Sequence, residues 1–329
     1  MDFLSKTNTP LDFFVFFFAL VVVFINGWTD APGSIFSIVA SGRLKLWQGA
    51  LLSGIFNFLG VFVSSLVGAS VAKSIFSIVS ISSQQSTSVV CLSCFITIIL
   101  FGVLAWFFGL PSSESHAMIF SLFGALFALG IQKSSFVSQV MYIIFSMIFS
   151  CVCAYFISFL VTALTKKLQL PYKNLLPLSC AALSFTHGAQ DGQKFLGVLL
   201  FVLSIGADEY PSTPPFALIL LVSLVMALST LLGGGRIIKT LSKTSSALDY
   251  HSSFCSDIGS FLTIALCSAL GMPISTGNVK SLSIIGCATC KKEYINKKMT
   301  GKILLASVIT LPACFIIGYI LCKIIMRFL

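Results

Sequence analysis

Two aspartates stand inside long apolar stretches of the chain. Asp30 closes the run that begins at Asn26, and Asp191 closes the run that begins at His187. If these stretches cross a membrane, each carboxylate costs at least ~2.5–3.5 kcal/mol to insert and so needs a partner and usually a function. Glycine and proline nearby predict a break in both helices, where carboxylates beside freed carbonyl groups would suit Na⁺ or a proton. A structural ion pair is the alternative for Asp191, because Lys194 follows one turn later.

A second pair of motifs combines proline with hydroxyl side chains. One reads Pro111-Ser112-Ser113-Glu114-Ser115-His116 and the other reads Pro273-Ile274-Ser275-Thr276-Gly277-Asn278. Proline followed by serine or threonine is typical of a helix start, where free N–H groups bind anions. We therefore expect two such starts to converge on one oxyanion. Glu114 and Asp257 are the other acids in or beside apolar segments, and His116 either titrates during function or braces its motif.

Both motif pairs recur at nearly one distance along the chain. Asp30 and Asp191 are separated by 161 positions, and Pro111 and Pro273 by 162. Two independent motifs that recur at one offset indicate an internal duplication. We therefore predict a first repeat over residues 1–165, a linker over 166–174 and a second repeat over 175–329.

The composition identifies the surroundings of these motifs. The chain has 329 residues, of which 57% are hydrophobic and only 9% charged, against about 25% charged in soluble domains. This excludes a soluble domain and a disordered chain. The net charge of +10 does not indicate nucleic-acid binding, because the basic residues mostly lie between apolar segments, where they set orientation in the bilayer. We expect a multi-pass protein of the cell (inner) membrane.

Ten apolar segments follow from a requirement of about 20 residues per spanning helix. They are 12–40, 47–71, 88–109, 111–131, 136–165, 175–205, 215–233, 257–271, 273–290 and 303–328. Segment 257–271 would be only about 22 Å long, so it and 273–290 could form a re-entrant hairpin. Each half then crosses three times, or five without hairpins, and either odd number inverts the second half. The predicted fold is all-α, with two inverted repeats, broken helices and two re-entrant hairpins, which is typical of secondary transporters.

At these four motifs the sequence resembles the PiT, or Pho4, family of inorganic phosphate transporters. The family has a duplicated Gly-Ala-Asn-Asp signature and a duplicated Pro-x-Ser-(Ser/Thr)-(Thr/Ser)-His signature. Here they read NGWTDAPGSI, SFTHGAQDGQKFLGVL, GLPSSESHAMI and GMPISTGNVKS. The resemblance implies a transporter rather than an enzyme, which carries inorganic phosphate with Na⁺ or H⁺ by alternating access and holds no bound cofactor.

The resemblance also implies roles for individual residues. Asp30 and Asp191 would hold the coupling ion, as candidate Na⁺ ligands, with Asp257 as a further coupling acid. Glu114 and His116 are coupling candidates from the residue pattern rather than from the resemblance. The implied phosphate contacts are Asn26, Gln190, Ser112, Ser113, Ser115, Ser275 and Thr276. Gly277 and Asn278 replace the usual Thr-His of the second hairpin, which leaves the coupling ion open.

Three alternatives remain at this point. The cargo could be sulfate or a metal–phosphate complex, because hydroxyl and N–H groups alone do not discriminate among tetrahedral oxyanions. An intramembrane hydrolase built on Ser115, His116 and Asp191 is disfavoured, since adjacent side chains on one helix point apart. The sequence also leaves open whether the protein forms a homo-oligomer.

Overall fold

The computed structural model describes residues 10–67, 84–111, 113–131, 136–205, 214–245 and 249–328. Ser112, one of the expected phosphate contacts, lies outside the described residues. The helices are α1 (Pro10–Thr29), α2 (Pro32–Ala40), α3 (Leu46–Val67), α5 (Gln84–Phe108), α6 (Glu114–Ala128), α7 (Phe136–Thr165), α8 (Tyr172–Ser204), α9 (Phe216–Leu231), α10 (Gly235–Leu241), α11 (Tyr250–Ala269), α12 (Thr276–Lys291) and α13 (Lys297–Phe328). In these ranges the helices are joined by turns and short irregular connections, and one isolated β-bridge, Ser245 with Ile295, is the only β-type pairing, so the all-α prediction is confirmed.

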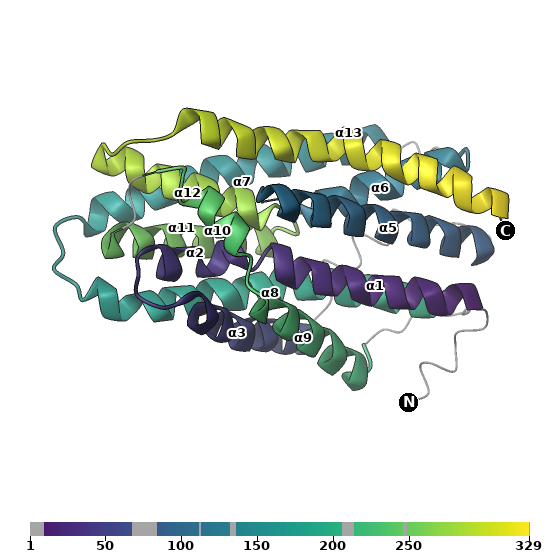
Figure 1. The fold of residues 1–329 in the computed structure, drawn as a ribbon, viewed down its shortest axis with the longest axis horizontal. Helices are drawn as coiled ribbons and strands as arrows, with labels where there is room; N and C mark the ends of the chain where they lie inside the picture. The colour runs from purple at the N-terminus through teal and green to yellow at the C-terminus, as the bar shows by residue number, and fades with distance from the viewer. Residues whose placement is uncertain are drawn as a thin grey trace.

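Most helices run along the long axis of the molecule, and α1 begins at the same end at which α13 finishes (Figure 1). Six described segments are long and apolar enough to cross a membrane, and the bent pair α9–α10 would make a seventh. Large apolar side chains such as Phe108 and Phe156 are more than half exposed on the outside, as expected of a surface that faces lipid. The chain is therefore a multi-pass membrane protein.

The predicted break in the first segment is confirmed. α1 ends at Thr29 and α2 begins at Pro32, which leaves Asp30 and Ala31 between the two helices. Proline suits the first turn of α2 because it has no N–H to satisfy there. Residues 10–40 still form one apolar span, so the break is a two-residue turn between two helices within a membrane-spanning segment.

The predicted break in the second segment is wrong. α8 runs without interruption from Tyr172 to Ser204, through Asp191. Its glycines serve close packing instead: a Cβ on Gly188 would overlap the backbone of Asn57 in α3, and one on Gly192 would overlap Val61. Small residues at such contacts let two membrane helices approach each other. Asp191 is therefore presented from a continuous helix and Asp30 from a broken one.

The predicted start of the segment at 257 is also wrong. α11 begins at Tyr250, and its N-cap Asp249 accepts a hydrogen bond from the Ser252 backbone N–H. Twenty residues give a helix of about 30 Å, so the shortness that suggested a re-entrant hairpin does not hold for this limb. The second helix of each expected hairpin is short: α6 has 15 residues and α12 has 16. Each follows a tight connection that contains a glycine with positive φ, Gly109 before α6 and Gly271 before α12.

The same helix contacts are found again when the two halves of the chain are exchanged. α3 of the first half packs on α8 of the second, and in the same way α9 of the second half packs on α1 of the first. Likewise α6 packs on α13, and α12 packs on α7. The same holds for α1 with α5 and for α8 with α11. Two glycines allow α6 to pack closely on α13 and α12 to pack closely on α7. A Cβ on Gly124 would overlap the Phe315 carbonyl of α13, and one on Gly286 would overlap the Tyr155 carbonyl of α7.

Candidate functional site

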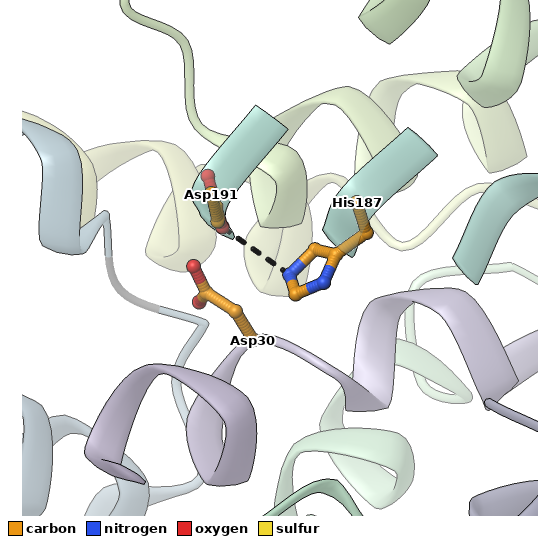
Figure 2. A group of neighbouring side chains, drawn as sticks. All are labelled: Asp30, His187 and Asp191. Atoms are coloured by element: carbon orange, nitrogen blue, oxygen red, sulfur yellow. Dashed lines mark ion pairs between the residues drawn. The ribbon is translucent and has the colours of Figure 1, made fainter. Parts of the chain in front are cut away.

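The two aspartates that recur in the sequence meet in space. Asp30, from the break after α1, and Asp191, from α8, lie side by side with His187 (Figure 2), and one ligand atom of each lies within 4.8 Å of the others. All three are buried. The Asn26 amide joins the carboxylates, since its Nδ2 donates to Asp30 Oδ2 and to Asp191 Oδ2, both at 3.3 Å.

Lys194 supplies the positive charge of this site. Its Nζ lies 2.7 Å from Asp191 Oδ1 and donates to Ser115 Oγ at 2.8 Å. His187 Nε2 lies 3.3 Å from the other oxygen of Asp191, and its Nδ1 lies 3.2 Å from Asn57 Oδ1. The ion pair that the sequence offered for Asp191 exists, and it also ties α8 to the first residues of α6.

The start of α6 brings a third acid to the site. Ser113 caps the helix by accepting the His116 backbone N–H, and Glu114 follows as its first residue. The Thr29 hydroxyl, at the end of α1, donates to Glu114 Oε1. Because Thr29 precedes Asp30, this bond fixes the edge of the helix break against the tip of α6.

The starts of α6 and α12 converge, as the sequence predicted. Ser275 caps α12 by accepting the Asn278 backbone N–H, which repeats the cap of α6. Pro111 lies against Gly277, where an added Cβ would stand only 2.9 Å from the proline side chain. Thr276 lies beside the Asp30 carboxyl group. Two helix N-termini from different halves of the chain thus face the same pair of aspartates, and N-termini favour anions.

Several buried acceptor atoms at this centre have no donor within the described part of the chain. They are Asn26 Oδ1, Asp30 Oδ1 and Glu114 Oε2. Buried polar atoms are almost always hydrogen-bonded, so three unmatched oxygens in one place are unusual. Carboxylate and amide oxygens are the ligands that hard cations prefer, and the residues present therefore fit a small cation.

Two predicted residues lie in this region without a defined partner. Both side-chain atoms of Gln190 and both ring nitrogens of His116 are buried and lack a hydrogen-bond partner among the described residues. Asp257 lies elsewhere: it pairs with Lys280 at 2.5 Å and accepts from Ser179 at 2.8 Å. In the described ranges no hydrogen bond or ion pair joins it to Asp30 or Asp191.

Sequence reasoning assigned no site role to Thr29, His187 or Lys280. His187 and Thr29 stand within the motifs already singled out, so position alone could have suggested them. Lys280 carried one signal, since it is a lone cation inside the apolar segment 273–290. A buried lysine requires an acid partner, and Asp257 was the nearest in sequence of the four acids in or beside apolar segments.

The structure does not form the hydrolase arrangement of Ser115, His116 and Asp191. A nucleophile needs a base within hydrogen-bond reach, but Ser115 Oγ accepts a hydrogen bond from Lys194 Nζ rather than from the His116 ring, and the same Nζ is paired with Asp191. A bundle of spanning helices that gathers acids, an ammonium group and two helix starts at its centre instead defines a membrane transporter of small ions.

Comparison with known proteins gives the family. Residues 26–178 and 169–318 match the phosphate transporter family, and the chain belongs to it. A probable low-affinity inorganic phosphate transporter of Bacillus subtilis is 27% identical, over 92% of this chain and 93% of its own. One with the same description from Rhizobium meliloti is 29% identical, over 91% and 92%.

A solved structure shares the fold. It is described as the sodium-dependent phosphate transporter, and it superposes with a TM-score of 0.83 over 98% of this chain and 100% of its own at 19% identity. The resemblance found in the four sequence motifs is therefore confirmed at the level of the family and the fold.

Proposed function

We propose that this protein is a cation-coupled symporter that carries inorganic phosphate across the membrane by alternating access. One observation carries the proposal: Asp30 and Asp191, from two halves of the chain, share the Asn26 amide in a buried site with unmatched acceptor oxygens. The printed descriptions of the relatives, which name inorganic phosphate, and of the structural neighbour, which names sodium, support the choice of cargo and ion.

Charge explains why the cation and the anion would travel together. Three carboxyl groups, from Asp30, Glu114 and Asp191, face one buried ammonium group, that of Lys194. This excess of acid groups repels phosphate. A bound Na⁺ or an added proton reduces the repulsion, and the N–H groups at the starts of α6 and α12 then bind the anion. The hydroxyls of Ser115 and Thr276 would complete that binding site.

Alternating access requires two parts that move about the site. The reciprocal helix contacts and the two similar helix starts support the predicted inverted repeats, over residues 1–165 and 175–329. In such transporters the two repeats rock against each other about a fixed binding site. The contact between Pro111 and Gly277 would then lie on the boundary that opens and closes.

Uptake of radiolabelled phosphate into proteoliposomes tests the proposal. A Na⁺ gradient and a pH gradient are imposed separately, with sulfate or arsenate as competitor. We expect accumulation under one gradient and its loss in Asp191→Asn. Asp249→Asn is the matched control, because that aspartate is half exposed at the start of α11 and asparagine caps helices equally well.

Each result has a distinct meaning. Wild-type cation dependence in Asp191→Asn would contradict the role of the shared site. Accumulation of sulfate without phosphate would contradict phosphate as the transported anion, while the assignment to the family would stand. Phosphate uptake that needs a divalent metal would point to a metal–phosphate complex.

A further inference from the structure

A second buried charge cluster lies apart from the proposed phosphate site. Lys280, in α12, is 1% exposed, and Asp257, in α11, is fully buried. The lysine Nζ lies 2.5 Å from Asp257 Oδ1, 2.7 Å from Ser37 Oγ in α2 and 3.0 Å from Ser256 Oγ. Two helices, α2 and α11, therefore direct three oxygen atoms at one ammonium group that a third helix, α12, supplies.

The surroundings of this ammonium are those of a monovalent cation site. An ammonium group has three N–H donors, and here each has one oxygen acceptor. A carboxylate and two hydroxyls are also suitable ligands for a hard cation such as Na⁺. The remaining oxygen of Asp257 is held by Ser179 of α8 at 2.8 Å, so the carboxylate is oriented toward the cluster from both sides.

The cluster is well placed to affect transport. Ser37 lies in α2, the helix that follows the break at Asp30, and Lys280 lies one turn after Thr276 at the start of α12. A Cβ on Gly33, the second residue of α2, would stand 3.9 Å from Lys280 Cβ. The Lys280 ammonium group therefore holds α2, the helix after the break at Asp30, against α12, in which Lys280 lies.

We propose that Lys280 is a tethered cation, whose ammonium group permanently fills a monovalent-cation site formed by Asp257, Ser37 and Ser256. The charge of Asp257 is then neutralised by the chain itself. This inference refines the proposed function, because a transporter with this site filled carries one mobile cation fewer per phosphate than the same transporter with the site open.

Removal of the lysine side chain tests the proposal by binding rather than by transport. Lys280→Ala leaves room where the ammonium was, so the purified variant should bind one Na⁺ more per chain than the wild type in equilibrium dialysis with radiolabelled Na⁺. The double variant Lys280→Ala with Asp257→Asn should return to the wild-type number. Lys291→Ala is the matched control, since Lys291 also pairs with an aspartate, the half-exposed Asp249, at 2.7 Å.

Thermal unfolding covers the case in which the single variant is unstable. Lys280→Ala should unfold at a lower temperature than the wild type in choline chloride and recover in NaCl, whereas the double variant should show no added response to Na⁺. Loss of stability in both salts, or an equal number of bound Na⁺ in Lys280→Ala and wild type, would overturn the proposal and leave a plain structural ion pair.

The two proposals can fail separately. If wild-type protein takes up no phosphate under either gradient, the proposed function fails, but an extra Na⁺ in Lys280→Ala still supports the tethered cation. If wild-type protein is a symporter and Lys280→Ala gains no ion, only the tethered cation fails. With both correct, the ratio of Na⁺ to phosphate taken up should be higher by one in Lys280→Ala.

Discussion

Asn26 and Asp191 are 165 positions apart in the sequence, and the Asn26 amide donates to the Asp191 carboxylate at 3.3 Å. The same nitrogen lies 3.3 Å from Asp30 Oδ2. One neutral side chain therefore connects the acids of the two halves, while its own oxygen has no donor in the described structure. This places Asn26 at the centre of the proposed cation site.

Replacement of Asn26 should weaken the binding of the coupling ion more than it weakens the binding of phosphate. In Asn26→Ala both carboxylates lose a hydrogen bond, which for a charged acceptor is worth about 1.5–3 kcal/mol, and the ion loses an oxygen ligand. We expect the cation concentration for half-maximal phosphate uptake to rise about ten-fold or more. Asn174→Ala, at an exposed position near the start of α8, should leave it unchanged. An unchanged cation dependence in Asn26→Ala would argue against this site.

Removal of Lys194 should destabilise the protein through Asp191. In Lys194→Met the Asp191 carboxylate keeps its burial and loses its ion pair, and breaking a buried pair costs about 3–5 kcal/mol. Thermal unfolding in detergent should therefore occur at a lower temperature. Adding Asp191→Asn removes the uncompensated charge, so the double variant should be more stable than Lys194→Met alone. Equal stability of the single and double variants would mean that the pair contributes packing rather than charge.

A side chain at Gly188 should push α8 away from α3. Its Cβ would overlap the backbone of Asn57, and overpacking of this kind costs about 1–3 kcal/mol. We expect Gly188→Ala to unfold at a lower temperature and to transport less phosphate. Gly301→Ala in α13 is the control: nothing lies within 4 Å of the added Cβ, and alanine favours a helix by about 1 kcal/mol over glycine.

The start of α11 should show a pH-dependent contribution to stability. Burial raises the pKa of Asp249, but hydrogen bonds from Lys291 and Ser252 outweigh it and hold the pKa below its ordinary value of 3.8. A depressed pKa means that the stabilisation is present above pH 3.8 and is lost as the pH falls through the lower, folded-state pKa.

Asp249→Ala checks this contribution by thermal unfolding at several pH values. The variant should lose about 1 kcal/mol at neutral pH, the usual contribution of an N-cap, and the difference from the wild type should shrink as the pH is lowered below 3.8. A difference that grows on acidification would contradict the sign of the shift.

Duplication made the centre of the site predictable. Because Asp30 and Asp191 recur at the same offset as Pro111 and Pro273, the sequence alone indicated that both acids and both helix starts belong to one site. The family match covers the same motifs. The broken first helix was also predictable, since Pro32 cannot continue the hydrogen bonding of α1.

The second break was not predictable from the same kind of signal. Glycine near an aspartate is compatible with an unwound helix and with a helix that packs closely on another, and the choice depends on the partner. For Gly188 and Gly192 the partners are Asn57 and Val61 of α3, more than 120 positions away. Hydropathy along the sequence could not distinguish an unwound helix from a continuous helix that packs closely on another.

Lys280 and the start of α11 were missed for a related reason. The polar residues from Asp249 to Ser256 lower the apparent hydropathy of the segment, although Ser252, Ser253 and Ser256 are buried in the bundle. With the helix start placed at 257, Asp257 seemed to lie at a segment edge. In the structure it lies more than one turn inside α11, where its charge requires the lysine.

The close contacts of Gly124 with α13 and of Gly286 with α7 have a consequence for how the protein is made. α6 ends at Ala128 and lies against α13, which begins only at Lys297; the different colours of the two helices show how far apart they are made (Figure 1). During insertion α6 must therefore persist without its packing partner. The contacts of α6 with α5 and of Glu114 with Thr29 can form within the first half, whereas the contact of α6 with α13 can form only once α13 has entered the bilayer.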